Sequence, residues 1–145
     1  FSTGLPYVEP SFPDPHGGEI GIQGTRSAEA LKLWLGLRQL GEEGINSLLD
    51  EAIIRKSYLE KRIDKKIFNI ISGPLHIISL TPKNIEVSHA EIWSMKTKKN
   101  LLDKNYMVSR PYYKGRYHIK IVLGNPYTEL HHLEELAEMI NLSFS

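Results

Sequence analysis

The sequence contains no cysteine. Disulfide bonds and zinc sites built on thiolates are therefore excluded. It also has no hydrophobic run near the length of about 20 residues that spans a bilayer, and its first residues lack the pattern of a secretory signal peptide. From these absences we expect a cytoplasmic protein with no membrane partner.

An excess of charge of one sign is also missing. The chain has 18 Lys and Arg against 17 Asp and Glu, a formal net charge of +1. Binding to nucleic acid or to an anionic membrane depends on a basic surface, so we expect neither partner.

Motifs for metal binding and for hydrolysis are absent as well. His131 and His132 are adjacent, and neighbours on a helix are expected to diverge rather than share an ion. No His and Glu cluster has the spacing of metal ligands, and neither a Gly-x-Ser-x-Gly motif nor a P-loop occurs. We therefore expect no metal site.

The first 18 residues are expected to form an extended loop. The first 18 of the 145 residues contain Pro6, Pro10, Pro13 and Pro15 and three glycines. That content is too high for a helix or a central strand. A domain seldom begins with such a loop, so we expect the chain to be a piece of a longer one.

The rest of the chain alternates helical and strand patterns. Ser27 is a good helix N-cap, and Gly41 is expected to end that helix. A second, amphipathic helix should run to about Asp64. The remaining expected elements are a strand at 67–72, a strand at 75–80, a helix at 89–100 capped by Ser88, strands at 106–113 and 117–123 that turn at Lys114-Gly115, and a final helix capped by Thr128. This order predicts an α+β domain, an antiparallel sheet covered by helices.

Several short motifs are more specific than this pattern. They are Gly24-Thr25-Arg26, Lys32-Leu33-Trp34-Leu35, Leu40-Gly41 with Gly44, and the Lys120–Pro126 segment KIVLGNP. In this order they resemble the pyridoxal-phosphate-dependent amino acid decarboxylases, the group that includes the glutamate, aromatic amino acid and histidine decarboxylases. The resemblance implies the C-terminal small domain of a type I pyridoxal-phosphate enzyme, with helices on one face of an antiparallel sheet. It divides the chain into a loop and entry strand of the large domain (1–26), linking helices (27–64) and the small domain (65–145).

The resemblance also implies an activity. Such enzymes are homodimeric lyases that convert an L-amino acid to an amine, with pyridoxal phosphate bound to a lysine that follows a histidine. No His-Lys pair occurs in this sequence. The chain would then lack the catalytic lysine and a large N-terminal domain, and would supply the second half of an active site.

The resemblance places three roles near the N-terminus. Tyr7 lies where the family has a mobile loop whose tyrosine returns a proton after carbon dioxide leaves. Gly24 and Thr25 would reach the cofactor phosphate of a neighbouring subunit. Arg26 stands at the mouth of a helix, where an anion could sit, and it would contact substrate or brace the subunit interface.

A fourth role falls on the last strand. The family holds the substrate carboxylate with an arginine just before an Asn-Pro pair, and here that place is Lys120. A lysine cannot offer the two-pronged fork of a guanidinium. Arg116, four residues earlier on the same expected face, could substitute, or both could be solvent-facing charges. Alternatives to a decarboxylase are an aminotransferase of the same fold and a non-catalytic paralogue or interaction module.

Overall fold

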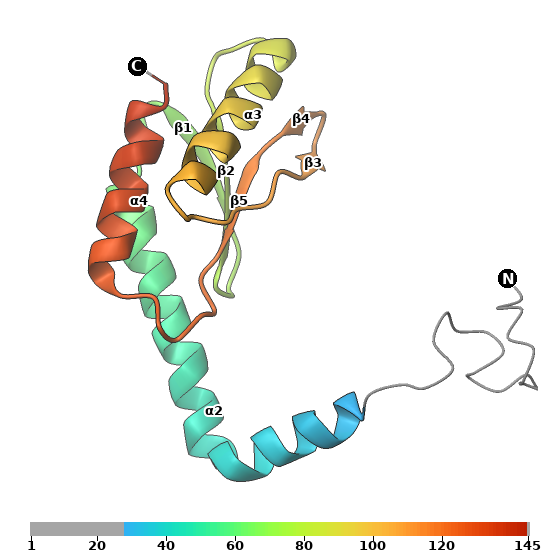
Figure 1. Ribbon diagram of the computed structural model, residues 1–145. Coiled ribbons are helices and arrows are strands. Elements are labelled where there is room, and N and C mark those ends of the chain that lie inside the picture. Colours follow the sequence, from blue (N-terminus) through green and yellow to red (C-terminus); the bar gives the residue numbers. More distant parts are fainter. Residues whose placement is uncertain (1–27, 145) are drawn as a thin grey trace, which may run out of the picture. The chain divides into compact units, whose positions relative to one another are not determined.

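The computed structural model describes residues 28–144 and divides the chain into two compact units, Phe1–Gly41 and Glu42–Ser145. The helix α2 (Glu29–Arg62) contributes to both (Figure 1). At Gly41 its backbone has φ 64° and ψ −175°, so α2 is two helices joined at a kink. Residues with a side chain rarely adopt that backbone conformation, which explains why the residue here is glycine. The predicted helix break at Gly41 is confirmed.

The described part of the first unit is unusually apolar. Six large apolar side chains between residues 31 and 40 are exposed, and Leu33 reaches 64 %. They are Leu31, Leu33, Trp34, Leu35, Leu37 and Leu40. They cover a much wider arc of the helix than a single stripe, and Glu29, Lys32 and Gln39 lie on the remaining side.

The second unit is built on a three-stranded antiparallel sheet in the order β1-β2-β5. Its strands are β1 (Phe68–Ser72), β2 (Ile77–Pro82) and β5 (Ile119–Val122). In the register, Ile70 lies opposite Leu80, and Ile78 lies opposite Ile121. The break between the first two strands at Gly73-Pro74 was predicted.

Helices cover one face of this sheet. They are α3 (Val87–Asp103), α4 (Leu130–Leu142) and the part of α2 that follows Glu42 (Figure 1). One buried cluster joins all three to the sheet. Its members are Leu59, Ile63, Phe68, Ile78, Leu80, Trp93, Leu101, Val108, Ile119, Ile121, Leu123, Leu133, Leu136, Ala137 and Ile140. The predicted α+β class, with helices on one face of an antiparallel sheet, is confirmed.

Two predicted helix caps are wrong. The helix α3 has Glu86 rather than Ser88 at its N-cap, and no side chain bonds the backbone there. The helix α4 has Glu129 rather than Thr128 at its N-cap, in a capping box with His132, whose Nδ1 accepts from the Glu129 N–H at 3.1 Å. An acid at the N-cap also suits the positive end of the helix dipole.

The predicted strands at 106–113 and 117–123 are much shorter than expected. Only β3 (Tyr112–Tyr113) and β4 (Arg116–Tyr117) form a hairpin, around the predicted Lys114-Gly115 turn. Both turn residues have positive φ, 47° and 79°, as a two-residue hairpin requires. The preceding segment pairs with β5 at a single bridge, between Ser109 and Lys120. At Pro111 one ladder bond is missing, because its nitrogen has no N–H to donate, but its carbonyl still accepts from the His118 N–H at 3.0 Å.

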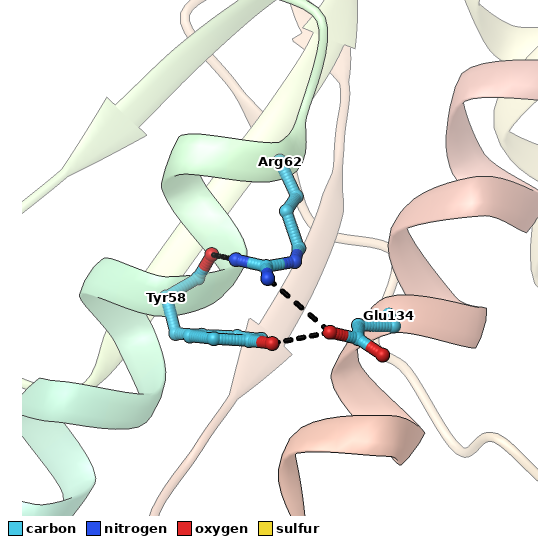
Figure 2. A network of polar contacts seen from close by, with 3 residues as sticks. All are labelled: Tyr58, Arg62 and Glu134. Carbon is cyan, nitrogen blue, oxygen red and sulfur yellow. Dashed lines mark hydrogen bonds and ion pairs between the residues drawn. The ribbon is translucent and has the colours of Figure 1, made fainter.

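A polar network ties α2 to α4. The hydroxyl of Tyr58 donates to a Glu134 carboxylate oxygen, and the Arg62 guanidinium donates to the same oxygen at 3.2 Å (Figure 2). The guanidinium also lies over the Tyr58 ring, 3.4 Å from its centre. The bond from Tyr58 lowers the pKa of Glu134 and raises that of Tyr58. The three side chains bond to one another, so we interpret the network as a structural link between α2 and α4.

Candidate functional site

The site is centred on Lys120 of β5. Its neighbours in the strand, Ile119 and Ile121, are buried against the helices. Because side chains alternate along a strand, Lys120 points to the opposite face of the sheet, which α3 and α4 do not cover. Among residues 28–144, no hydrogen bond or ion pair engages its ammonium. The predicted apolar face of this strand is confirmed, and Lys120 remains available to a ligand.

Two serines lie directly across from Lys120. Ser79 pairs with it from β2, and Ser109 pairs with it through the isolated bridge. The bridge consists of two backbone bonds, Lys120 N–H to Ser109 C=O at 2.8 Å and Ser109 N–H to Lys120 C=O at 3.0 Å. Side chains of directly opposed residues share a face. Within the described residues neither serine hydroxyl has a hydrogen-bond partner.

Apolar side chains flank this group on the same face. Ile71 of β1 lies opposite Ser79, and Ile77 and Val122 pair with each other one step along the sheet. Ile77 and Val122 are exposed. An ammonium with apolar neighbours interacts with an anion more strongly than one in open water, because the local dielectric constant is lower.

The spacing predicted that Arg116 and Lys120 lie on one strand, but the structure places them in different strands. Arg116 belongs to β4, in the two-stranded sheet, whereas Lys120 is in β5. Its guanidinium donates to the carbonyl oxygens of Ile85 at 2.9 Å and Pro82 at 3.4 Å. These bonds hold the loop after β2 and account for much of the donor capacity of Arg116.

His118 separates the two strands. The alternation predicts that it shares the outward face with Lys120, but its side chain is buried, with only 2 % exposed. The His118 N–H donates to the Pro111 carbonyl at 3.0 Å, in register with the Ser109–Lys120 bridge and the Tyr113–Arg116 pair. The Nδ1 atom lies 3.1 Å from the Arg116 carbonyl oxygen, and burial lowers the pKa of the imidazole.

The other predicted site residues, Tyr7, Gly24, Thr25 and Arg26, lie outside the described residues, as does the expected cap Ser27. Across residues 28–144 no group of three or more His, Asp or Glu side chains could hold a metal ion. The rings of His131 and His132 do not diverge as expected, since their centres are 3.9 Å apart. None of the described helices is long and apolar enough to cross a membrane.

A hollow of about 590 Å³ opens beyond the end of β5. Val122, Met107 and Tyr127 are among the residues that line it, and Lys120 is not. Lys120 is therefore not part of this hollow, and its ammonium lies on the sheet face opposite α3 and α4. A ligand there would need a second surface to enclose it.

Comparison with known proteins places this geometry in context. No family model matches the sequence, and no curated protein sequence matches it. Solved structures do match. Oryza sativa TDC with PLP and tryptamine has 15 % identity and a TM-score of 0.70 over 84 % of this chain and 28 % of its own. Mouse CSAD in apo form has 19 % identity and a TM-score of 0.68 over 94 % of this chain and 32 % of its own.

A third match is Catharanthus roseus tryptophan decarboxylase in complex with L-tryptophan. It has 21 % identity and a TM-score of 0.67 over 84 % of this chain and 26 % of its own. The chain thus spans about a third or less of the length of the structures it matches. It has the fold of the C-terminal portion of the pyridoxal-phosphate-dependent decarboxylases.

The two serines beside Lys120 were not identified from the sequence. Ser79 is 41 residues from Lys120 in the chain, and only strand register brings them together. A signal existed in part, since both serines sit among β-forming residues. The partner of each could not be read without the register.

Proposed function

We propose that this chain is part of a pyridoxal-phosphate-dependent lyase that decarboxylates an L-amino acid to an amine. Its segment would supply residues that anchor the substrate and residues of a dimer interface. The observation that carries the proposal is the Lys120 ammonium, which has no partner among residues 28–144. By the resemblance of the KIVLGNP segment, its position corresponds to that of the family's carboxylate-binding arginine. The likeness in fold to decarboxylases supports it.

The roles follow from the chemistry of each group. When bound, the cofactor supplies an electron sink for the bond that breaks. Lys120 holds the substrate carboxylate as a point charge, with Arg116 as the second candidate, and so orients the bond to be cleaved. The phenol O–H of Tyr7 donates a proton to the carbon that has lost carbon dioxide.

Cofactor contacts would come from the residues before α2. The backbone at Gly24 allows close approach to a phosphate, and the Thr25 hydroxyl and N–H can donate to it. Arg26 contacts substrate or braces the interface. The donors around Lys120, an ammonium and hydroxyls, suit an anionic oxygen, which fits the substrate carboxylate.

The proposed protein is a cytoplasmic homodimer with a large domain that precedes this chain. The exposed apolar side chains around the first half of α2 support a cover by further protein. So wide an apolar surface on a helix is stable in water only when other surfaces pack on it.

A second candidate is a non-catalytic paralogue or interaction module of the same fold. The lysine at position 120, where the family has arginine, favours it. An aminotransferase is a third, since one fold hosts several reactions. A His-Lys pair after a strand in the rest of the gene product would support an enzyme, and its absence would support the module.

Replacement of Lys120 tests the proposal. In the full-length protein, Lys120→Met should weaken amino acid binding without loss of folding, because a charge-assisted contact is worth about 1.5–3 kcal/mol. That is a change in affinity of roughly ten- to a hundredfold. Lys120→Arg should preserve or improve binding. The measurement is the change in cofactor absorbance on titration with candidate amino acids.

Lys96→Met is the matched control. Lys96 is exposed on α3, and its ammonium has no partner among the described residues. Affinity should not change in this variant. Equal affinity of the Lys120→Met protein and the wild type would show that the anchor lies elsewhere.

A further inference from the structure

We infer that Ser79 and Ser109 complete the carboxylate site, so that a Ser79–Lys120–Ser109 row binds both oxygens of one carboxylate. This inference rests on the proposed function and deepens it. It assigns two specificity-determining residues that the family motif does not include.

The row is defined by strand pairing. Lys120 exchanges both backbone bonds with Ser109, so these two form a hydrogen-bonded pair. The backbone groups of Lys120 therefore point away from Ser79, and the Ser79–Lys120 pair is of the non-hydrogen-bonded kind. In such a pair the Cα atoms are about 4.5 Å apart, against about 5.5 Å in the other kind. The Cα atom of Ser79 is thus expected to lie closer to that of Lys120 than the Cα atom of Ser109 does.

The heights of the groups above the sheet are compatible with one ligand. A serine hydroxyl is two bonds from its Cα, and a lysine ammonium is five. A carboxylate oxygen about 2.7 Å beyond the hydroxyl stands level with the ammonium of an extended lysine. The second oxygen of the same carboxylate then points sideways to Lys120. One carboxylate can therefore accept from both groups.

This arrangement compensates for a lysine at position 120, where the family has an arginine. A guanidinium binds both carboxylate oxygens in its own plane, whereas an ammonium is a point charge that does not fix their orientation. A hydroxyl from a neighbouring strand supplies the second donor. The row therefore restores two-point recognition with a lysine.

The surroundings favour a ligand over water. Ile71 continues the row beyond Ser79, and Ile77 and Val122 lie in the next row of the same face. Within residues 28–144 the three polar groups of the row have no other hydrogen-bond partner. An isolated polar group among apolar neighbours gains from a matched ligand more than one that already has partners.

The test uses carboxylates that cannot react with the cofactor. Calorimetry on the full-length protein compares indole-3-propionate, 3-phenylpropionate and glutarate with the corresponding amides. For at least one pair the wild type should prefer the carboxylate by about ten- to a hundredfold, the range of a charge-assisted contact. Ser79→Ala should reduce that preference about three- to tenfold, and Ser109→Ala by less, since a neutral donor contributes about 0.5–1.5 kcal/mol.

Ser72→Ala is the matched control, because Ser72 is in the same sheet but pairs with Ile78 on the other face. It should leave the preference unchanged. Circular dichroism confirms that each variant is folded. If Lys120→Met removes the preference and neither serine variant changes it, the row is refuted and the proposed function stands. If Lys120→Met leaves it unchanged, or the wild type has none, both fail.

Discussion

At the scale of single residues, His118 shows how burial sets chemistry. It is a titratable group in an apolar setting, with the Tyr113 ring 6.1 Å away and a single carbonyl partner at Nδ1. A carbonyl oxygen only accepts, so Nδ1 carries a proton in this contact. Burial lowers its pKa from the ordinary value of about 6.5 because the charged form loses its hydration.

This burial predicts a stability that depends on pH. Above about pH 6.5 the imidazole is neutral in both states, and its contribution is fully present. As the pH falls from there through the lower pKa of the folded state, the unfolded chain takes up the proton first, and the free energy of unfolding decreases. His118→Asn, whose amide can still donate to the Arg116 carbonyl, should lack this component. Urea unfolding of both proteins from pH 7.5 to 5 measures it, and parallel curves would contradict the assignment.

At the scale of elements, the β3–β4 hairpin depends on its two-residue turn. Lys114 and Gly115 both have positive φ, a conformation that suits the right-handed twist of the strands. The hairpin presents Tyr117, which packs against the Tyr112 ring with centres 5.0 Å apart and under the Arg110 guanidinium at 3.7 Å. Arg110 in turn bonds Ser94 of α3 at 2.8 Å. The turn therefore helps to hold the hairpin against α3.

Replacement of the turn glycine should weaken this element. Gly115→Ala places a Cβ at φ 79°, which costs about 1–2 kcal/mol for an L-residue. Gly73→Ala is the control, because its φ is not positive and a Cβ there meets no atom within 4 Å. Urea unfolding should show a loss of about that size for Gly115→Ala only. An equal effect of the two substitutions would mean that the turn conformation is not the cause.

At the scale of the whole molecule, stability resides in the second unit. Every member of the buried cluster follows Glu42 in the chain, from Leu59 to Ile140. The described residues of the first unit leave their large apolar side chains exposed. The described residues of the second unit therefore bury their own apolar side chains, whereas those of the first unit do not.

A chain that begins at Glu42 should therefore unfold cooperatively, with a midpoint close to that of the whole chain. Ile78→Ala, which truncates a fully buried side chain, should lower stability by about 2–5 kcal/mol in both. Thermal unfolding followed by circular dichroism gives the comparison. Loss of a cooperative transition in the shorter chain would show that residues before Glu42 are needed for the fold.

The sequence by itself determined the features that depend on neighbours along the chain. The helix break at Gly41, the strand break at Gly73-Pro74 and the turn at Lys114-Gly115 follow from local backbone preferences. Periodicity likewise predicted the order of helices and strands and the buried face of β5. These effects act over a few residues, so a single sequence carries them.

Only the tertiary structure decided which side chains meet around Lys120. Ser79 and Ser109 join it through strand register, a property of contacts between distant segments that a shift of one residue would invert. The same contacts drew Arg116 to the carbonyls after β2 and buried His118. Strand alternation predicts the face on which a residue lies but not what covers that face, because the cover comes from segments distant in the chain.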